Sequence, residues 1–261
     1  MPASDQPRRA PAFLAVVVVA LVLVAVAAVI VSRRGGSPTL DSGRQALPGP
    51  VVLVPGYGGG TEALTTLAAR LRAQGRAATV LHLEGDGTGD LREQAALLGR
   101  TVDALRAAGA PSVDVVGYSA GGIVARLWAS DNGGAALARR IVLLGTPNHG
   151  AQIAGLGAAF GGALCPPGCR QLAPDSELLA GLNDEGLPVG PQWVSIWTTQ
   201  DEVVTPPDSA RIDGAVDVAV QEVCPSAQVA HSGLPTAPSS SALVLRALAV
   251  APFTSPATCP G

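Results

Sequence analysis

The sequence Val113-Asp114-Val115-Val116-Gly117-Tyr118-Ser119-Ala120-Gly121 joins a short, mostly β-branched run to the pattern G-x-S-x-G. A strand, a sharp turn that carries a serine and a following helix form a nucleophile elbow, whose strained turn exposes the serine oxygen. Glycines beside the serine leave room for the strand and the helix to approach each other. The alternative is a glycine-rich turn whose serine caps the next helix. The rest of the chain favours the elbow, as the following paragraphs explain.

Short apolar runs alternate with amphipathic segments on both sides of this motif. The expected strands cover residues 51–54, 78–83, 113–116, 141–144, 193–197 and 216–220, and the expected helices cover residues 61–74, 89–108, 120–130 and 240–250. This alternation predicts a mostly parallel sheet of about six strands with helices on both faces. We therefore predict one α/β domain in residues 50–261.

The composition argues against a nucleic-acid partner. The chain has 261 residues, of which 14% are charged, and its formal net charge is −3. This length suits one α/β domain with a small appendage. Nucleic-acid binding needs a concentrated face of Lys and Arg, and the chain has no basic block longer than an Arg pair.

The N-terminal region has an uninterrupted apolar segment, residues 12–31, between Arg8-Arg9 and Arg33-Arg34. A helix of this length reaches about 30 Å, which is the thickness of a bilayer core. The segment is longer than the apolar core of most signal peptides, and no clear A-x-A cleavage site follows it. We predict a cytoplasmic tail and a transmembrane signal anchor in residues 1–34 and a flexible linker in residues 35–49, so that the protein meets the cell membrane through its N-terminal helix. Secretion after signal cleavage is the alternative.

Four cysteines lie in the C-terminal part of the chain: Cys165, Cys169, Cys224 and Cys259. Of the three possible pairings, we expect Cys165–Cys169 and Cys224–Cys259. A zinc site is the alternative, but the spacing lacks two matched C-x-x-C pairs and no histidine is close in sequence. We therefore expect no metal. Because disulfides persist outside the cytoplasm, we predict that the α/β domain is extracytoplasmic.

A serine nucleophile in this kind of fold is followed along the chain first by an acid and then by a histidine. His231 alone follows both Ser119 and an acid at the end of a strand, since His82 precedes Ser119 and His149 precedes any suitable acid. We predict Asp201 as the acid, because it directly follows the expected strand 193–197 and can orient the histidine. Other acids on the same connection are less favoured: Glu202, Asp208 and Asp213.

A tetrahedral oxyanion needs two backbone donors. The amide of Ala120, directly after the serine, is the first expected donor. The second is expected in the glycine-rich exit of the first strand, residues 54–60. That loop lacks the G-x-G-x-x-G pattern and the lysine of a phosphate-binding loop, so we discount a nucleotide site.

From residue 50 to the last expected helix, the chain resembles the small bacterial lipases and esterases of the α/β-hydrolase fold, of actinobacterial type. The resemblance rests on motifs in the family's order: Val54-Pro55-Gly56-Tyr57-Gly58-Gly59, Gly117-Tyr118-Ser119-Ala120-Gly121-Gly122, Leu144-Gly145-Thr146-Pro147-Asn148-His149-Gly150, Gln171-Leu172-Ala173-Pro174-Asp175-Ser176-Glu177-Leu178-Leu179, Asp201-Glu202-Val203-Val204 and His231-Ser232-Gly233-Leu234.

The resemblance implies that the second oxyanion donor is the amide of Tyr57. It also implies that His149 lies at the rim of an acyl pocket, and we expect Tyr118 to contact substrate as well. Many members of the family have His-Gly where this chain has Pro55-Gly56. Because the donor is a backbone amide, the oxyanion site does not depend on that histidine.

We therefore expect a monomeric, extracytoplasmic carboxylic-ester hydrolase that acts on a lipid or small ester through an acyl-enzyme, without a cofactor. An acyltransferase or thioesterase would use the same triad, because the fold and the triad do not determine the acceptor. A non-catalytic, membrane-anchored binding protein is the other alternative. Residues 150–187 are the one stretch long enough to shape an acyl pocket or a small lid, through Ile153, Leu156, Phe160 and Leu164, and packing on the sheet is the alternative for these side chains.

Overall fold

A computed structural model describes residues 42–160 and 165–260 of the chain. The predicted tail and membrane anchor in residues 1–34 and the first part of the predicted linker lie outside the described residues. Among the described helices, none has both the length and the apolar character that a membrane crossing requires.

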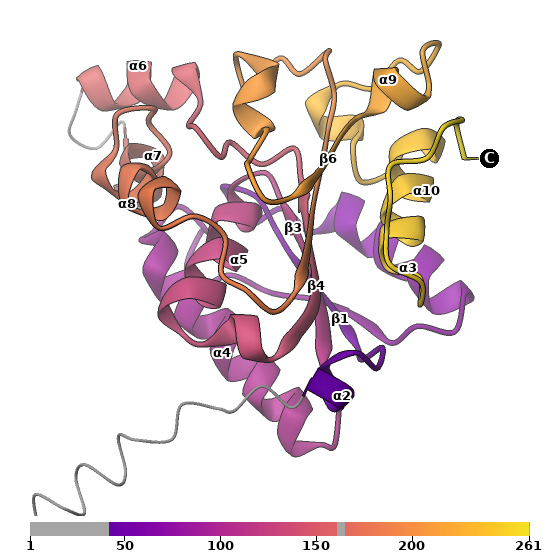
Figure 1. The fold of residues 1–261 in the computed structure, drawn as a ribbon. Helices are drawn as coiled ribbons and strands as arrows, with labels where there is room; N and C mark the ends of the chain where they lie inside the picture. Colours follow the sequence, from indigo (N-terminus) through magenta and orange to yellow (C-terminus); the bar gives the residue numbers. More distant parts are fainter. Residues whose placement is uncertain (1–41, 161–164, 261) are drawn as a thin grey trace, which may run out of the picture. The chain divides into compact units, whose positions relative to one another are not determined.

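The centre of the domain is a six-stranded parallel sheet in the order β2-β1-β3-β4-β5-β6 (Figure 1). Its strands are β1 (Val51–Val54), β2 (Ala78–Val80), β3 (Val113–Tyr118), β4 (Ala138–Leu144), β5 (Gln192–Trp197) and β6 (Val216–Ala219). The predicted parallel sheet is thus confirmed. The prediction ended this strand at residue 83, whereas β2 ends at Val80. β2 is shorter because it is an edge strand that pairs only with β1.

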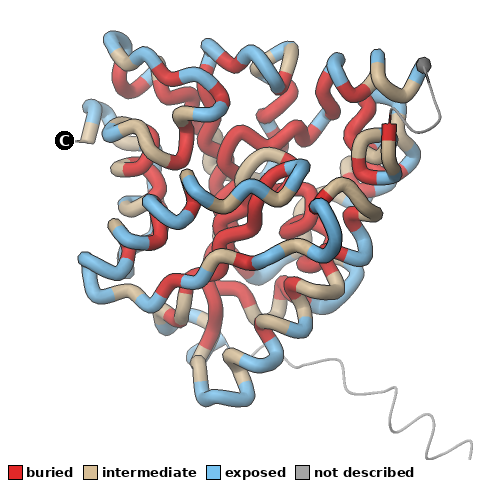
Figure 2. Tube along the Cα trace, turned by 180° about the vertical axis from the view of Figure 1, so that it is seen from behind, coloured by how far each residue is buried: buried red, intermediate tan, exposed pale blue. Residues whose placement is uncertain are grey.

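Helices cover both faces of the sheet. On one face lie α3 (Glu62–Ala73) and α10 (Pro238–Ala247), and on the other lie α4 (Leu91–Ala107) and α5 (Ala120–Asp131) (Figure 1). Alternate residues of each strand point to opposite faces, so Val51 and Leu53 pack with α3 and α10, whereas Val52 and Val54 pack with α4 and α5. The strands are consequently the most buried part of the domain (Figure 2).

Three helices that the periodicity did not indicate lie between β4 and β5: α6 (Gln152–Phe160), α7 (Pro167–Gln171) and α8 (Glu177–Glu185). On α6, Ile153 and Leu156 are each 64% exposed, so these two side chains do not pack on the sheet. The side chain of Phe160 and all of Leu164 lie outside the described residues. The remaining short helices are α2 (Ser42–Gln45) and α9 (Val220–Val223).

Residues 42–49, at the end of the predicted linker, contact the domain. The side chain of Gln45 donates hydrogen bonds to the carbonyls of Ala135 (2.7 Å) and Ala138 (2.6 Å), at the start of β4. The hydroxyl of Ser112, just before β3, donates to the carbonyl of Leu47. These residues therefore belong to the folded domain.

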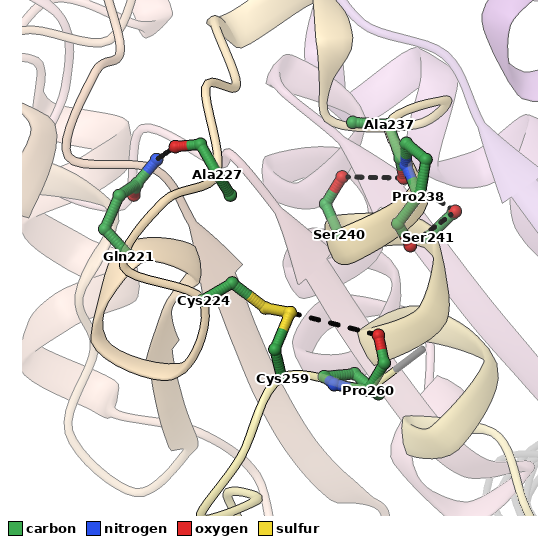
Figure 3. Close-up of a disulfide and its surroundings, with 9 residues drawn as sticks. All are labelled: Gln221, Cys224, Ala227, Ala237, Pro238, Ser240, Ser241, Cys259 and Pro260. Atoms are coloured by element: carbon green, nitrogen blue, oxygen red, sulfur yellow. Dashed lines mark hydrogen bonds between the residues drawn. A yellow bond between two sulfur atoms is a disulfide. The ribbon is translucent and has the colours of Figure 1, made fainter.

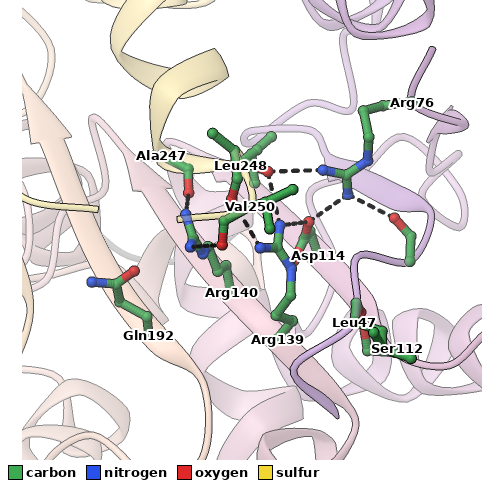
Figure 4. A network of polar contacts seen from close by, with 12 residues as sticks. Leu47, Arg76, Ser112, Asp114, Arg139, Arg140, Gln192, Ala247, Leu248 and Val250 are labelled. Atoms are coloured by element: carbon green, nitrogen blue, oxygen red, sulfur yellow. Dashed lines mark hydrogen bonds and ion pairs between the residues drawn. The ribbon is translucent and has the colours of Figure 1, made fainter. Parts of the chain in front are cut away.

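A buried network of charged side chains attaches the end of α10 to the amino-terminal ends of the strands (Figure 4). Asp114 of β3 is fully buried and binds Arg139 through two hydrogen bonds of 3.0 and 2.6 Å, and it also pairs with Arg76 at 2.5 Å. Arg139 and Arg140 donate to carbonyls that follow the end of α10, including that of Leu248. Burial and the neighbouring Arg139 lower the pKa of Arg140 to about 10.

Both expected disulfides are present, and none of the four cysteines is free. Cys165–Cys169 closes a local loop at the start of α7, whereas Cys224–Cys259 joins the end of α9 to the C-terminal tail (Figure 3). The zinc alternative is therefore wrong for these cysteines. Two disulfides suggest a protein that is exported from the cytoplasm.

The two bridges are expected to differ in their contribution to stability, because a cross-link removes more chain entropy when it closes a longer loop. Loss of Cys224–Cys259, with a separation of 35 residues, should lower the free energy of unfolding by about 4 kcal/mol. Loss of Cys165–Cys169, with a separation of 4 residues, should lower it by about 2 kcal/mol. Denaturant unfolding of the two double Cys→Ala variants measures the difference, and equal or reversed losses would contradict it.

Candidate active site

Ser119 lies on a strained turn between β3 and α5. Its φ of 53° is the one positive φ among the described residues other than glycine. The surrounding glycines are required by close approach: a Cβ on Gly117 would lie 2.5 Å from the carbonyl oxygen of Gly121, and one on Gly121 would lie 2.3 Å from that of Val54. Ser119 makes no side-chain cap to α5, so the capping interpretation is wrong. The hydroxyl of Ser119 faces a histidine side chain instead of the helix.

The hydroxyl of Ser119 meets a histidine that is in turn bound by an acid. His231 Nε2 lies 3.0 Å from Ser119 Oγ, and His231 Nδ1 lies 2.7 Å from Asp201 Oδ2. The side chains of His231 and Asp201 are 6% and 1% exposed. If Nδ1 carries the proton toward the carboxylate, the lone pair of Nε2 faces the hydroxyl, which is the arrangement for general-base activation of a nucleophile.

Asp201 is held by the loop that follows β5. Its Oδ1 accepts hydrogen bonds from the backbone N–H groups of Val203 (2.9 Å) and Val204 (2.7 Å), which leaves Oδ2 for the histidine. The competing acids Asp208 and Asp213 are exposed. Glu202 contacts the backbone of His231 rather than its ring. The structure thus brings Asp201, and not its neighbours, to the imidazole.

Tyr118 contacts the histidine directly. Its hydroxyl donates a 3.2 Å hydrogen bond to the backbone carbonyl of His231, and the two ring centroids lie 5.2 Å apart. Burial, with smaller contributions from Asp201 and Glu202, raises the pKa of Tyr118 to about 12. The phenol therefore stays a donor well above neutral pH. The sequence indicated a substrate contact for Tyr118 and did not reveal this support of His231.

The two expected oxyanion donors lie on segments that meet beside Ser119. Ala120 is the first residue of α5, so its N–H has no partner within the helix. The loop after β1 approaches so closely that a Cβ on Gly56 would lie 3.0 Å from Ser119 Cβ. Tyr57, the next residue, is 41% exposed. The N–H of Gly58 donates to the carbonyl of Gly87 (3.2 Å), which holds this loop in place.

His149 is exposed, and its side chain lies beside Asn183 of α8, with 3.3 Å between Nδ1 and Nδ2. A cavity of about 140 Å³ lies there, and neither Ser119 nor His231 is among the residues that line it: Arg126, His149, Asn183, Gly186, Arg211, Ile212 and Asp213. A larger cavity, of about 710 Å³, is lined by residues around the start of α4 and by α7 and α8.

Arg126 is a buried residue that the sequence analysis did not identify. Its guanidinium donates to the carbonyl of Leu182 and to the side-chain oxygen of Asn183, both at 2.9 Å, and to Asn148 at 3.3 Å. It therefore ties α5, which begins directly after Ser119, to the loop after β4 and to α8. Burial lowers its pKa to about 10. The one available signal was a lone charge in an otherwise apolar helical segment.

Within the described residues, no group of three or more His, Cys, Asp or Glu side chains is arranged to hold a metal ion.

The raised pKa of Tyr118 makes a prediction about alkaline stability. Because its folded pKa of about 12 exceeds the ordinary value of 10.0, its contribution to stability is fully present below pH 10 and is lost as the pH rises toward 12. The stability of wild type should fall relative to Tyr118→Phe across this range. Urea unfolding of both proteins at pH 8 to 11.5 measures the difference, and a difference that is independent of pH would contradict the assignment.

Comparisons with known proteins find a family model and several solved structures that are similar to this chain. The family model described as lipase (class 2) matches residues 100–221, which is less than half of the chain. Lipase BlEst2 of Bacillus licheniformis, in its mature form, is similar in structure with a TM-score of 0.60 and 19% identity, over 72% of this chain and 86% of that one. Lipase B of Aspergillus fumigatus has a TM-score of 0.63 and 17% identity, over 86% of this chain and 56% of that one.

Est1E from Butyrivibrio proteoclasticus has a TM-score of 0.54 and 16% identity, over 77% of this chain and 86% of that one. A search of curated proteins finds no match. The chain thus has the α/β-hydrolase fold, and its similarity to class 2 lipases supports a hydrolase of the lipase or esterase type.

Proposed function

We propose that this protein is an extracytoplasmic serine hydrolase that cleaves carboxylic esters through an acyl-enzyme. The observation that carries the proposal is the hydrogen-bonded series from Asp201 through His231 to Ser119, with contacts of 2.7 and 3.0 Å at the strained turn after β3. The similarity to class 2 lipases supports esters of the lipase type as the proposed substrates.

In the proposed reaction, Ser119 Oγ attacks the ester carbonyl while His231 Nε2 takes its proton. The carboxylate of Asp201 stabilises the imidazolium that forms, and the amides of Ala120 and Tyr57 bind the oxyanion of the tetrahedral intermediate. Collapse of the intermediate expels the alcohol, which receives the proton from His231. Water, activated by the same histidine, then attacks the acyl-enzyme and releases the acid.

Three features support a lipid-type substrate that the protein meets outside the cytoplasm. The disulfides agree with export, and we propose that the apolar segment 12–31 anchors the domain to the membrane unless it is cleaved. The exposed Ile153 and Leu156 on α6 offer an apolar surface to acyl chains.

We propose that His149, in the loop after β4, contributes to substrate preference rather than to proton transfer.

Ser119→Ala should lower kcat on nitrophenyl esters by about 10⁴- to 10⁶-fold, because the nucleophile of the acylation step is removed. A series of esters of increasing acyl length, assayed on wild type and variant, provides the measurement, with circular dichroism to establish that the variant is folded. Turnover close to that of wild type in a folded Ser119→Ala protein would reject the assigned nucleophile.

His231 and His149 should behave differently when each is replaced. His231→Ala removes the general base, so labelling of Ser119 by a fluorophosphonate should be abolished. His149→Ala should leave labelling intact and change KM or the acyl-length preference by about tenfold, which is about 1.4 kcal/mol. Labelling rates of the two variants are the measurement. A His231→Ala protein that labels normally, with a His149→Ala protein that does not, would show that the base is misassigned.

A further inference from the structure

Glu202, the residue after Asp201, contacts the same histidine at a second point. Its carboxylate Oε2 accepts a 3.0 Å hydrogen bond from the backbone N–H of His231, whereas Asp201 accepts one from the ring. Successive side chains of an extended chain point in opposite directions. Here the loop turns sharply, because Asp201 Oδ1 binds the N–H groups of Val203 and Val204, and both carboxylates reach His231.

The backbone N–H of His231 has no other partner in its own segment. His231 is the first residue of a short 3₁₀ helix, His231–Gly233, so its N–H has no acceptor within the helix. The residue at the N-cap is Ala230, which makes no side-chain hydrogen bond to the helix. Glu202 supplies the acceptor from a different loop.

The carbonyl of His231 is held from the opposite direction by the hydroxyl of Tyr118. A second pair of contacts lies two residues earlier, where Gln200 Oε1 accepts from the N–H of Val229 (2.9 Å) and Thr198 Oγ1 donates to its carbonyl (2.6 Å). The contacts at Val229 attach the loop as a whole. The contact of Glu202 acts on the residue whose ring must stay in reach of Ser119.

We propose that Glu202 is a positioning residue: its carboxylate holds the backbone of His231 so that Nε2 stays within hydrogen-bond distance of Ser119 Oγ. The inference rests on the proposed function, since it concerns the general base of that reaction. A backbone N–H needs an acceptor and not a charge, so an amide oxygen at this position should serve as well. Misplacement of a catalytic group by about 1 Å can lower a rate by about 10²-fold. Because Glu202 is exposed and water can replace part of its contact, we expect a smaller loss.

The test compares Glu202→Ala and Glu202→Gln with two matched controls. Asp208→Ala removes an exposed carboxylate from the same connection, and Gln200→Ala removes a neighbouring tie to the histidine loop at Val229 instead of His231. We expect Glu202→Ala to lower kcat about tenfold at a KM within twofold of wild type, and to slow fluorophosphonate labelling by the same factor. Glu202→Gln, Gln200→Ala and Asp208→Ala should stay within about threefold of wild type.

Each result bears on one statement. Normal kcat and labelling in Glu202→Ala would overturn the proposal, as would a loss in Glu202→Gln equal to that in Glu202→Ala. An equal loss of kcat in Gln200→Ala would mean that Glu202 only attaches the histidine loop, as Gln200 does. This result would also overturn the proposal. If Glu202→Ala does not fold, Glu202→Met takes its place, because methionine keeps the length of the side chain without the oxygen acceptor for the N–H of His231. The same tenfold loss is expected, and wild-type kcat in Glu202→Met would overturn the proposal. A wild-type protein that neither labels nor turns over esters would instead reject the proposed function.

Discussion

The close approach of α5 to the ends of β1 and β4 is the constraint on which the site depends. A Cβ on Gly121 would lie 2.3 Å from the carbonyl oxygen of Val54, and one on Gly122 would lie 1.8 Å from Thr146 Oγ1. The start of α5 therefore packs directly against the backbone of Val54 and against the buried Thr146, and neither glycine has room for a side chain. The chain turns from β3 into this position with a positive φ at Ser119, and the strained turn directs the hydroxyl to His231.

The remaining groups reach Ser119 because the parallel strands end at the same edge of the sheet. The loop after β1 brings Gly56 against the serine, the loop after β5 carries Asp201, and His231 follows β6 and α9. The histidine segment has little regular structure of its own, so its position depends on contacts from other segments: Asp201 at the ring, Glu202 at the N–H and Tyr118 at the carbonyl. At the amino-terminal ends of the strands, the buried charges around Asp114 hold the end of α10. Next to α9, the Cys224–Cys259 disulfide attaches the segment before His231 to the C-terminal tail.

Local signals accounted for most of the fold. The strands are short buried runs, and their alternation with helices leaves few arrangements other than a parallel sheet. The chain order selected His231 among three histidines. The acid was less sharply defined, and Asp201 was favoured over its neighbours because it directly follows a strand. The sequence pattern did not predict the helices between β4 and β5. The helices α6, α7 and α8 are short, and the apolar side chains Ile153 and Leu156 of α6 are exposed rather than packed, so no clear amphipathic period marks them.

By itself, the sequence determined the class of fold, the elbow at Ser119, the predicted partners of that serine and the pairing of the cysteines, because each of these follows from residue type, local spacing and order along the chain. Only the tertiary structure decided what touches His231. Glu202 and Tyr118 are far from His231 in sequence, and a loop glutamate next to an acid has the same appearance as any solvated charge. The same holds for Arg126, whose contacts with Asn148 and Asn183 exist only once α5, α8 and the loop after β4 have packed together. Long-range hydrogen bonds leave no periodic trace in a single sequence, since their partners are set by packing rather than by local conformation.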